Sequence, residues 1–375
     1  MPVSFNDRSL FLLINSTLWK TKLPIAAYEH VSDNDWEYLY QQARKQGLTG
    51  LVYDAISSLP TQQLPRNLHL RWVAHVEAIE ERYHQQQHAL EKLGALYRQH
   101  DIRILLLKGI GLSTMYPFPS HREGGDIDVY LFGDYEKANR IMEKNGIDVN
   151  TGISINPKHA IFYVKGIPVE NHRYFLNIDH AFKSNRILQD QLFNILKTHP
   201  CESLQVGEET IYLPPPMFNA YYLIMHIITH LAGFGVVLRH LCDWTIFLKT
   251  YHDTLDFKEL KDVLADAGYL KAVNLLTTLC VHHLDLAVDH AGPFYTSSNK
   301  SEDKLLQKAI LHPRYEDVSN IKHPLKVVYI KTARSIEHMK INILLHGYRF
   351  ALTYLFAILG KRIKQPQKIF RFSTK

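Results

Sequence analysis

The chain has 375 residues, of which 46% are hydrophobic and 21% are charged, as is ordinary for a globular protein large enough for two or three packed units. Its three cysteines are far apart, which argues against a disulfide framework and against structural zinc, and favours a reducing compartment. The net charge of +6 resides in residues 361–375, which hold six basic and no acidic side chains. The remaining chain is formally neutral, so no body-wide nucleic-acid surface is predicted.

The two ends of the chain carry the signals relevant to location. The apolar run at residues 10–14 is too short for a signal peptide, so we expect a cytoplasmic protein. Residues 350–359 are the most hydrophobic stretch, about half the roughly 20 residues that span a bilayer. We predict a C-terminal core helix followed by a solvated basic tail. The alternative is an interfacial helix that contacts anionic lipid and makes the protein membrane-associated.

Residues 1–100 are predicted to be an N-terminal helical region. Ser32 to Asp35 resembles a capping box at the start of a helix, and Gly47 is suited to its end. Residues 68–100 have the apolar periodicity of a long amphipathic helix.

Residues 101–213 are predicted to form a small α/β unit. The expected elements are a strand at 102–107, a short helix at 109–116, a strand at 126–132, a helix at 134–145, and strands at 160–164 and 167–172 joined by a turn at Lys165-Gly166.

Three consecutive prolines, from Pro214 to Pro216, mark the next boundary. Residues 214–360 are predicted to be a C-terminal helical region, with the clearest helices at 221–231 and 237–248, and residues 361–375 form the basic tail. The fold class predicted from this order is α+β, a small mixed β-sheet flanked by N-terminal and C-terminal helical regions.

The most informative feature is an Asp-x-Asp pair in an apolar run. Alternation along a strand places Asp126 and Asp128 on one face and directs Ile127 and Val129 to the other, which suits a core. Two neighbouring carboxylates are costly unless a cation lies between them. Sites rich in oxygen suit Mg²⁺ or Mn²⁺ bound together with the phosphates of a substrate. The pair therefore predicts metal-assisted phosphoryl or nucleotidyl transfer.

Four segments around this pair resemble the uncharacterised bacterial nucleotidyltransferase-like group of the polymerase-β-type superfamily. They are Leu107-Lys108-Gly109, Tyr116-Pro117, Arg122 followed at four residues by Asp126-Ile127-Asp128, and Val169-Glu170-Asn171-His172. Two downstream segments, at residues 226–230 and 238–244, also look like the helical region of that group.

The resemblance implies a two-metal site that takes two Mg²⁺ or Mn²⁺ ions. Asp126 and Asp128 would bind both ions, and Glu170 would complete the site and help to deprotonate the acceptor hydroxyl. The residues implied in nucleotide binding are Lys108, Gly109, Ser113, Arg122, His172 and Arg239. Among them, Gly109 would present backbone amides to the phosphates, while Lys108 and Arg122 would neutralise phosphate charge.

The function implied is transfer of a nucleoside monophosphate from an NTP to a hydroxyl of a small molecule, a protein or RNA. One departure supports an alternative. The usual Gly-Ser of the superfamily is replaced by Lys108-Gly109-Ile110-Gly111, which suggests a catalytically inactive nucleotide- or partner-binding protein. The Lys-Gly start and Asp-x-Asp are also similar to toxin-type nucleotidyltransferases that act on RNA. The tail offers few aromatic side chains for stacking, so no strong nucleic-acid signature is present.

Simpler interpretations stand beside these hypotheses. Glu170 could be a solvated strand residue. His226 and His230 have the spacing of a zinc pair, yet packing or substrate contact is the expected role. Arg239 and Asp243 are four residues apart, which predicts an ion pair within one helix unless Arg239 contacts a nucleotide or acceptor.

Overall fold

The computed structural model describes residues 5–60, 63–152, 158–176, 183–233, 235–297 and 300–311, with scattered residues between 323 and 347. The apolar segment at 350–359 and the basic tail at 361–375 lie outside the described residues. The predicted C-terminal core helix and its alternative, a helix that contacts lipid, therefore lie outside them as well. Across the described part of the chain, no helix combines the length and the hydropathy needed to cross a membrane.

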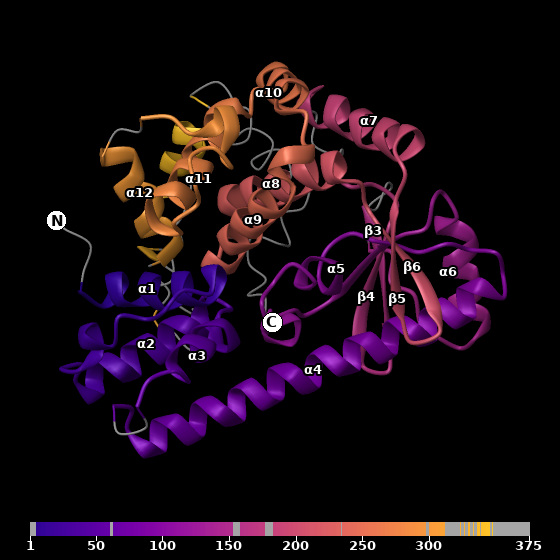
Figure 1. Cartoon of the computed structure of the whole chain (residues 1–375). Coiled ribbons are helices and arrows are strands. Elements are labelled where there is room, and N and C mark those ends of the chain that lie inside the picture. The colour runs from indigo at the N-terminus through magenta and orange to yellow at the C-terminus, as the bar shows by residue number, and fades with distance from the viewer. Residues whose placement is uncertain are drawn as a thin grey trace.

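A six-stranded mixed sheet forms the centre of the α/β region, which confirms the predicted α+β class (Figure 1). Its order is β3-β4-β2-β1-β6-β5, where β2 pairs with β4 and β1 with β6 in parallel, and the other neighbours are antiparallel. The strands are β1 (Leu105–Leu106), β2 (Ile127–Tyr130), β3 (His159–Val164), β4 (Ile167–His172), β5 (Glu202–Val206) and β6 (Glu209–Leu213).

The predicted β3–β4 hairpin turns at Lys165 and Gly166, which both have positive φ angles. The short helices α5 (Ile110–Ser113) and α6 (Tyr135–Lys144) also lie where the sequence predicts them. The hairpin β5–β6 and the helix before it, α7 (Lys183–Thr198), were not predicted from the sequence. The strand predicted over residues 102–107 is shorter in the structure, where β1 spans Leu105–Leu106.

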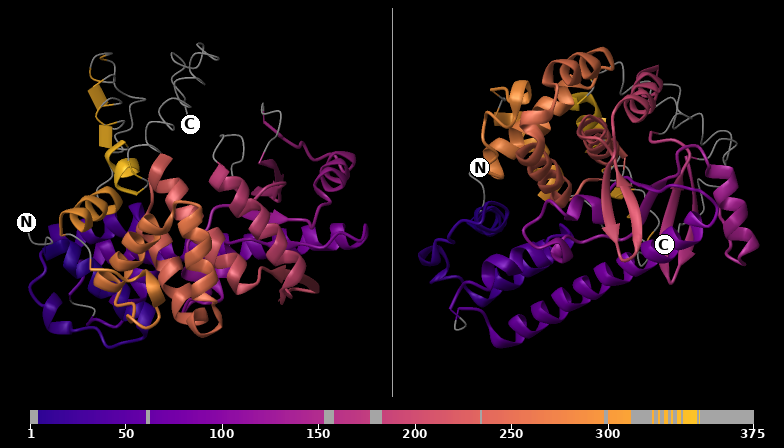
Figure 2. Two further views of the ribbon diagram at one scale, coloured as in Figure 1. Left: turned by 90° about the horizontal axis from the view of Figure 1, so that it is seen from above. Right: turned by 45° about the vertical axis from the view of Figure 1, so that its right-hand side comes forward.

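Helices before and after the sheet pack together as one body. They are α1 (Phe5–Trp19), α2 (Asp33–Lys45), α3 (Thr49–Ile56), α4 (Arg66–Arg98), α8 (Pro216–Gly233), α9 (Leu238–Tyr251), α10 (Phe257–Asp266), α11 (Leu270–His283) and α12 (Lys300–Leu311). Side chains of α1 tie the two groups together, since Asn15 Nδ2 donates to the His283 carbonyl at 3.1 Å and Trp19 Nε1 to that of Leu284 at 2.8 Å. The views of Figure 2 show this helical body beside the sheet.

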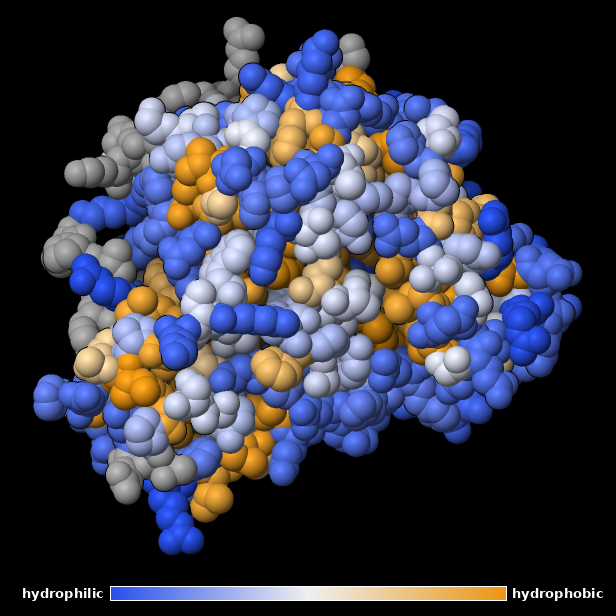
Figure 3. All heavy atoms as spheres, viewed as in Figure 1, coloured by the Kyte–Doolittle hydropathy of each residue, from blue (hydrophilic) through white to orange (hydrophobic). Residues whose placement is uncertain are grey.

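The two faces of the sheet have different surroundings. One face carries Ile127 and Val129, as predicted, and packs on apolar side chains of α4 and α6. In Figure 1 the long helix α4 runs beneath both the sheet and the N-terminal helices, and its outward side is mostly polar in Figure 3. The other face, which carries the predicted carboxylates, lies toward α8 and α9.

Gln46, just after α2, fixes the start of α9 although it is distant in sequence. Its buried side-chain oxygen accepts a hydrogen bond from the Leu238 amide at 2.6 Å, and its carbonyl accepts one from the Arg239 amide at 3.3 Å. Its side-chain nitrogen donates to the Ile310 carbonyl at 3.0 Å. Because the first amides of a helix lack partners within the helix, this capping stabilises the start of α9.

The first prediction concerns Gly50 in α3. A Cβ at this position would lie 2.8 Å from both the Cβ and the carbonyl oxygen of His121, which belongs to the 3₁₀ turn η2 (Pro119–His121). We expect Gly50→Ala to lower the free energy of unfolding by about 1–3 kcal/mol, measured by urea denaturation. Gly125→Ala is the control, since its Cβ would meet no atom within 4 Å and its cost should stay within about 0.5 kcal/mol. Equal losses in the two variants would contradict close packing at Gly50.

The second prediction concerns pH. His121 links η2 to α3 and α4, because its Nδ1 lies 2.6 Å from Asp54 Oδ1 and its Nε2 2.8 Å from Glu80 Oε1. Burial opposes the charge on the ring, but hydrogen bonds to Asp54 and Glu80 outweigh it and raise the pKa of His121 above 6.5.

A raised histidine pKa stabilises the fold below the unfolded value, and this stabilisation is lost as the pH rises through the folded value. We therefore expect the wild-type chain to exceed His121→Gln in stability by more at about pH 6 than at about pH 9, as measured by urea denaturation. A difference that grows with pH would have the wrong sign.

Candidate active site

The parallel pairing of β2 and β4 brings the three predicted carboxylates together. Asp128 on β2 lies directly opposite Glu170 on β4, and Asp126 immediately precedes β2 on the same face. One carboxylate oxygen from each of the three residues lies within 4.8 Å of the others. Asp126 and Asp128 therefore lie on one face of the sheet, as the Asp-x-Asp pattern predicts, and the strand register places Glu170 beside them.

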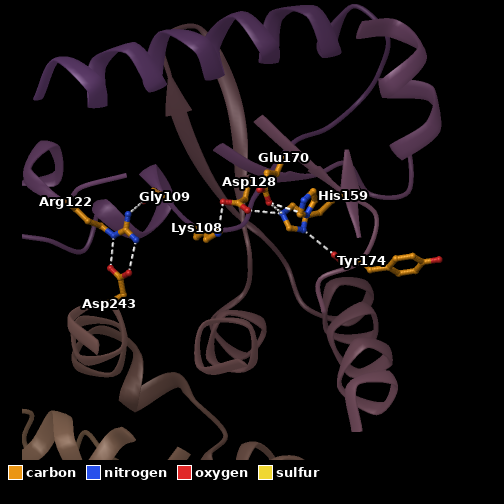
Figure 4. Close-up of polar contacts among 9 residues, drawn as sticks. Lys108, Gly109, Arg122, Asp128, His159, Glu170, Tyr174 and Asp243 are labelled. Atoms are coloured by element: carbon orange, nitrogen blue, oxygen red, sulfur yellow. Dashed lines mark hydrogen bonds and ion pairs between the residues drawn. The ribbon is translucent and has the colours of Figure 1, made fainter. Parts of the chain in front are cut away.

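Lys108 supplies a positive charge to this cluster. It follows β1, and its Nζ lies 3.1 Å from Asp128 Oδ2 (Figure 4). Burial would raise the pKa of Asp128, but the charge of Lys108 and a hydrogen bond to His172 lower it instead. For Asp126, burial and the charge of Asp128 outweigh the charge of Lys108 and raise the pKa. The positive charge of Lys108 alone therefore does not balance the three carboxylates.

Two histidines lie beside the carboxylates. His172 Nε2 is 2.9 Å from Asp128 Oδ1 and 3.4 Å from Glu170 Oε2. His159 on β3 faces His172 across the antiparallel pairing, and its Nδ1 is 3.3 Å from Glu170 Oε2. Figure 4 shows Asp128, Glu170 and His159 directed toward one another. His172 is among the site residues predicted from the sequence, whereas His159 is not.

Side chains of α8 and α9 face the same cluster. The Tyr222 hydroxyl is buried without a hydrogen-bond partner among the described residues, and burial followed by the charge of Asp128 raises its pKa. The imidazoles of His226, His230 and His240 gather nearby, with ring centroids 4.3–5.5 Å apart.

Burial first, and then the charge of Lys108, lowers the pKa of both His226 and His230. Two groups of potential ligands in the described chain converge closely enough to hold a metal ion, and both contain Glu170. The zinc hypothesis for His226 and His230 therefore gains no support from the geometry.

Lys158 is a second cation at the site and was not predicted from the sequence. It precedes β3, and its pKa is lowered by burial and then by the charge of Lys108, against the attraction of Asp128 and Glu170. A half-buried lysine near three carboxylates has no recognisable motif, because only the β3–β4 hairpin brings it there.

The predicted phosphate contact of Arg122 is not what the geometry favours. Its Nε and one terminal nitrogen donate to the two oxygens of Asp243 at 2.7 and 2.8 Å, and the other terminal nitrogen donates to the Gly109 carbonyl at 3.3 Å. Tyr116 also donates to Asp243, at 2.7 Å. The side chains of Arg122, Tyr116 and Asp243 are buried. Figure 4 shows this contact to one side of the carboxylate cluster, so Arg122 anchors the Gly109 turn to α9.

Gly109 needs its glycine for conformational reasons. It has a φ of +65°, which side chains rarely adopt, and the Asp126 carbonyl would lie 3.6 Å from an added Cβ. The turn before α5 therefore passes directly beside the Asp-x-Asp strand.

Ser113 and Arg239 are not directed at the carboxylates. The buried Ser113 hydroxyl donates to the Ile110 carbonyl within α5 at 2.7 Å. Arg239 donates to the Glu123 carbonyl, and its pKa is lowered by burial and by the charge of Arg122. The ion pair predicted between Arg239 and Asp243 is replaced by the bidentate pair of Asp243 with Arg122.

The third prediction tests this buried pair. Arg122→Met leaves Asp243 buried without its guanidinium partner, so we expect the free energy of unfolding to fall by about 3–5 kcal/mol in urea denaturation. The control is the double variant Arg122→Met/Asp243→Leu, which removes both charges and should be more stable than the single variant. A single variant as stable as wild type would refute the anchoring role.

Comparison with known proteins supports the class of site. Residues 32–285, more than half of the chain, match the family described as uncharacterised nucleotidyltransferase. A solved structure, an antigenic nucleotidyltransferase-like protein from Paracoccidioides brasiliensis, aligns with 12% identity and a TM-score of 0.32 over 54% of this chain and 93% of its own. No curated protein matches the chain. The family match, over residues that include every carboxylate of the site, shows that the chain belongs to the uncharacterised nucleotidyltransferase family.

Proposed function

We propose that the protein transfers a nucleoside monophosphate from an NTP to a hydroxyl group of an acceptor and releases pyrophosphate. The observation that carries this proposal is the convergence of Asp126, Asp128 and Glu170 beside the Gly109 turn. Membership of a nucleotidyltransferase family supports the general reaction class. The acceptor is a small molecule, a protein side chain or an RNA end.

The carboxylate cluster fits divalent cations. Burial and the charge of Asp128 raise the pKa of Asp126, and Asp128 Oδ2 lies beside the ammonium group of Lys108. Oxygen donors of this kind hold Mg²⁺ or Mn²⁺. Two such ions, when bound, would polarise the α-phosphate and neutralise charge on the attacking and leaving oxygens.

The residues of the chain then take distinct roles. Glu170 accepts the proton of the acceptor hydroxyl, and His172 holds both Glu170 and Asp128 in place. Lys108 exchanges its contact with Asp128 for the phosphates of the nucleotide, beside the amides that follow Gly109. Lys158 and the imidazoles of α8 and α9 face the same space and contribute further donors to a polyanionic substrate.

Arg122 acts indirectly in this proposal. Its contacts with Asp243 and the Gly109 carbonyl keep the turn in a fixed place relative to the carboxylates. Ser113 and Arg239 likewise support α5 and the segment around Glu123.

We place the reaction in the cytoplasm. All three cysteines, Cys201, Cys242 and Cys280, are free thiols, and two of them are buried, which suits a reducing compartment.

The fourth prediction tests the reaction. Purified protein is incubated with each α-³²P-labelled NTP, Mg²⁺ or Mn²⁺, and a cell extract, and label is followed into small molecules, protein and RNA. We expect transfer to fall by about 100-fold or more in Asp126→Asn and in Glu170→Gln, because each variant removes a carboxylate from the site. Asp148→Asn, which removes an exposed carboxylate of the same region, should retain wild-type activity.

Each result has a clear meaning. Label on RNA identifies the acceptor class of a toxin-type enzyme, and label on protein or a small molecule identifies the other classes. NTP binding without transfer to any acceptor would overturn the enzymatic proposal in favour of a silent nucleotide-binding protein.

A further inference from the structure

A second group of ligand atoms shares Glu170 with the carboxylate cluster. His159, Glu170 and His172 each offer one nitrogen or oxygen within 4.8 Å of the other two. Glu170 Oε2 lies 3.3 Å from His159 Nδ1 and 3.4 Å from His172 Nε2, and Asp128 Oδ1 lies 2.9 Å from the same His172 nitrogen. Two nitrogens and two carboxylate oxygens therefore face one small volume.

The His172 ring lies between two groups of oxygen atoms. Its Nδ1 is 3.3 Å from the Tyr174 carbonyl oxygen, and its Nε2 faces oxygens of Asp128 and Glu170. A metal ion bound to Nε2 would leave the ring proton on Nδ1, where the Tyr174 carbonyl can accept it.

This arrangement is typical of a metal-bound histidine. Histidine ligands usually donate their other ring N–H to a backbone carbonyl or a carboxylate, which fixes both tautomer and ring orientation. Here the carbonyl belongs to Tyr174, and its segment is itself held, because the amides of Arg173 and Tyr174 donate to the Lys158 carbonyl at 2.8 and 3.1 Å. The ring of His172 is buried in this frame.

Strand pairing also fixes the position of His159. The antiparallel register places it opposite His172, with ring centroids 5.2 Å apart. The neighbouring inward residues of the hairpin, Phe162 and Val169, are buried in the core. Both imidazoles therefore project from a rigid hairpin next to Glu170.

Lys108 contacts the other oxygen of Asp128. Its Nζ lies beside Oδ2, whereas the His172 ring lies beside Oδ1. The carboxylate thus has one oxygen on the side of Lys108 and one on the side of the imidazoles. The two sides differ in donor chemistry.

We propose that His159 and His172 are metal ligands together with Glu170 and Asp128, and that this mixed site selects a transition metal such as Mn²⁺ or Zn²⁺ over Mg²⁺. Imidazole nitrogen binds transition metals well, whereas Mg²⁺ prefers an all-oxygen shell that keeps several waters. The inference names the metal class for part of the proposed active site. It rests on the proposed function only in taking Asp128 and Glu170 as ligands.

The fifth prediction is tested on metal binding alone. The full chain is stripped with chelator, and Mn²⁺, Zn²⁺ and Mg²⁺ are titrated by calorimetry without nucleotide or acceptor. We expect Mn²⁺ and Zn²⁺ to bind at least about tenfold more tightly than Mg²⁺. His159→Ala should weaken Mn²⁺ and Zn²⁺ binding by about tenfold or more and leave Mg²⁺ binding unchanged. His84→Ala, which removes an exposed imidazole of α4, is the control and should change neither.

A spectroscopic measurement removes dependence on the variants. Pulsed electron paramagnetic resonance of the Mn²⁺-loaded wild-type protein should show ¹⁴N coupling from coordinated imidazole. If His159→Ala does not fold, this measurement alone decides whether imidazole nitrogen coordinates the metal. Manganese without nitrogen coupling, or Mg²⁺ binding as tight as that of Mn²⁺, would overturn the inference and make His172 a protonated donor to the carboxylates.

The test is independent of nucleotidyl transfer. A chain that binds Mn²⁺ through nitrogen but transfers no label retains this metal site and loses the proposed reaction. A chain that transfers label with no nitrogen coupling retains the reaction and loses only the imidazole ligands.

Discussion

The candidate site depends on how neighbouring groups offset the repulsion among three carboxylates that lie side by side on one face of the sheet. The parallel register of β2 and β4 forces Asp128 next to Glu170, and Asp126 adds a third negative charge. Burial and mutual repulsion raise the pKa of Asp126, whereas Lys108 and His172 lower that of Asp128. The opposite faces of β2 and β4 pack in the core, so the carboxylates cannot rotate away without disrupting it. The resulting charge imbalance gives the site its affinity for cations in our proposal.

A chain of buried contacts connects this site to distant parts of the sequence. Gln46 caps α9, α9 presents Asp243, Asp243 holds Arg122, and Arg122 donates to the carbonyl of Gly109. Removing a charge from the middle of such a chain is costly, because its partner remains buried. The turn expected to meet the phosphates is therefore held in place by residues from both helical regions.

Local patterns allowed much of the fold to be predicted. Alternation around Asp126 and Asp128, the turn at Lys165-Gly166 and the periodicity of α4 each depend on neighbours in sequence, and the structure contains all three elements. The strands β5 and β6 were missed because most residues of β5 are exposed and polar, so no apolar alternation marks the edge of the sheet. The partner of Arg122 and the location of His159 were missed for another reason. Each depends on tertiary packing or strand register, which leaves no spacing motif in the sequence.

The capping of α9 by Gln46 has a consequence for modularity. Every carboxylate, the Gly109 turn and both histidines lie between residues 101 and 213, which suggests a separable unit. Yet Asp243 lies beyond that segment, and Gln46, which orients its helix, lies before it. Transplanting the sheet onto a foreign scaffold would carry the reactive groups but not their alignment. Recombination between relatives would thus have to exchange the helices before and after the sheet as one inherited block.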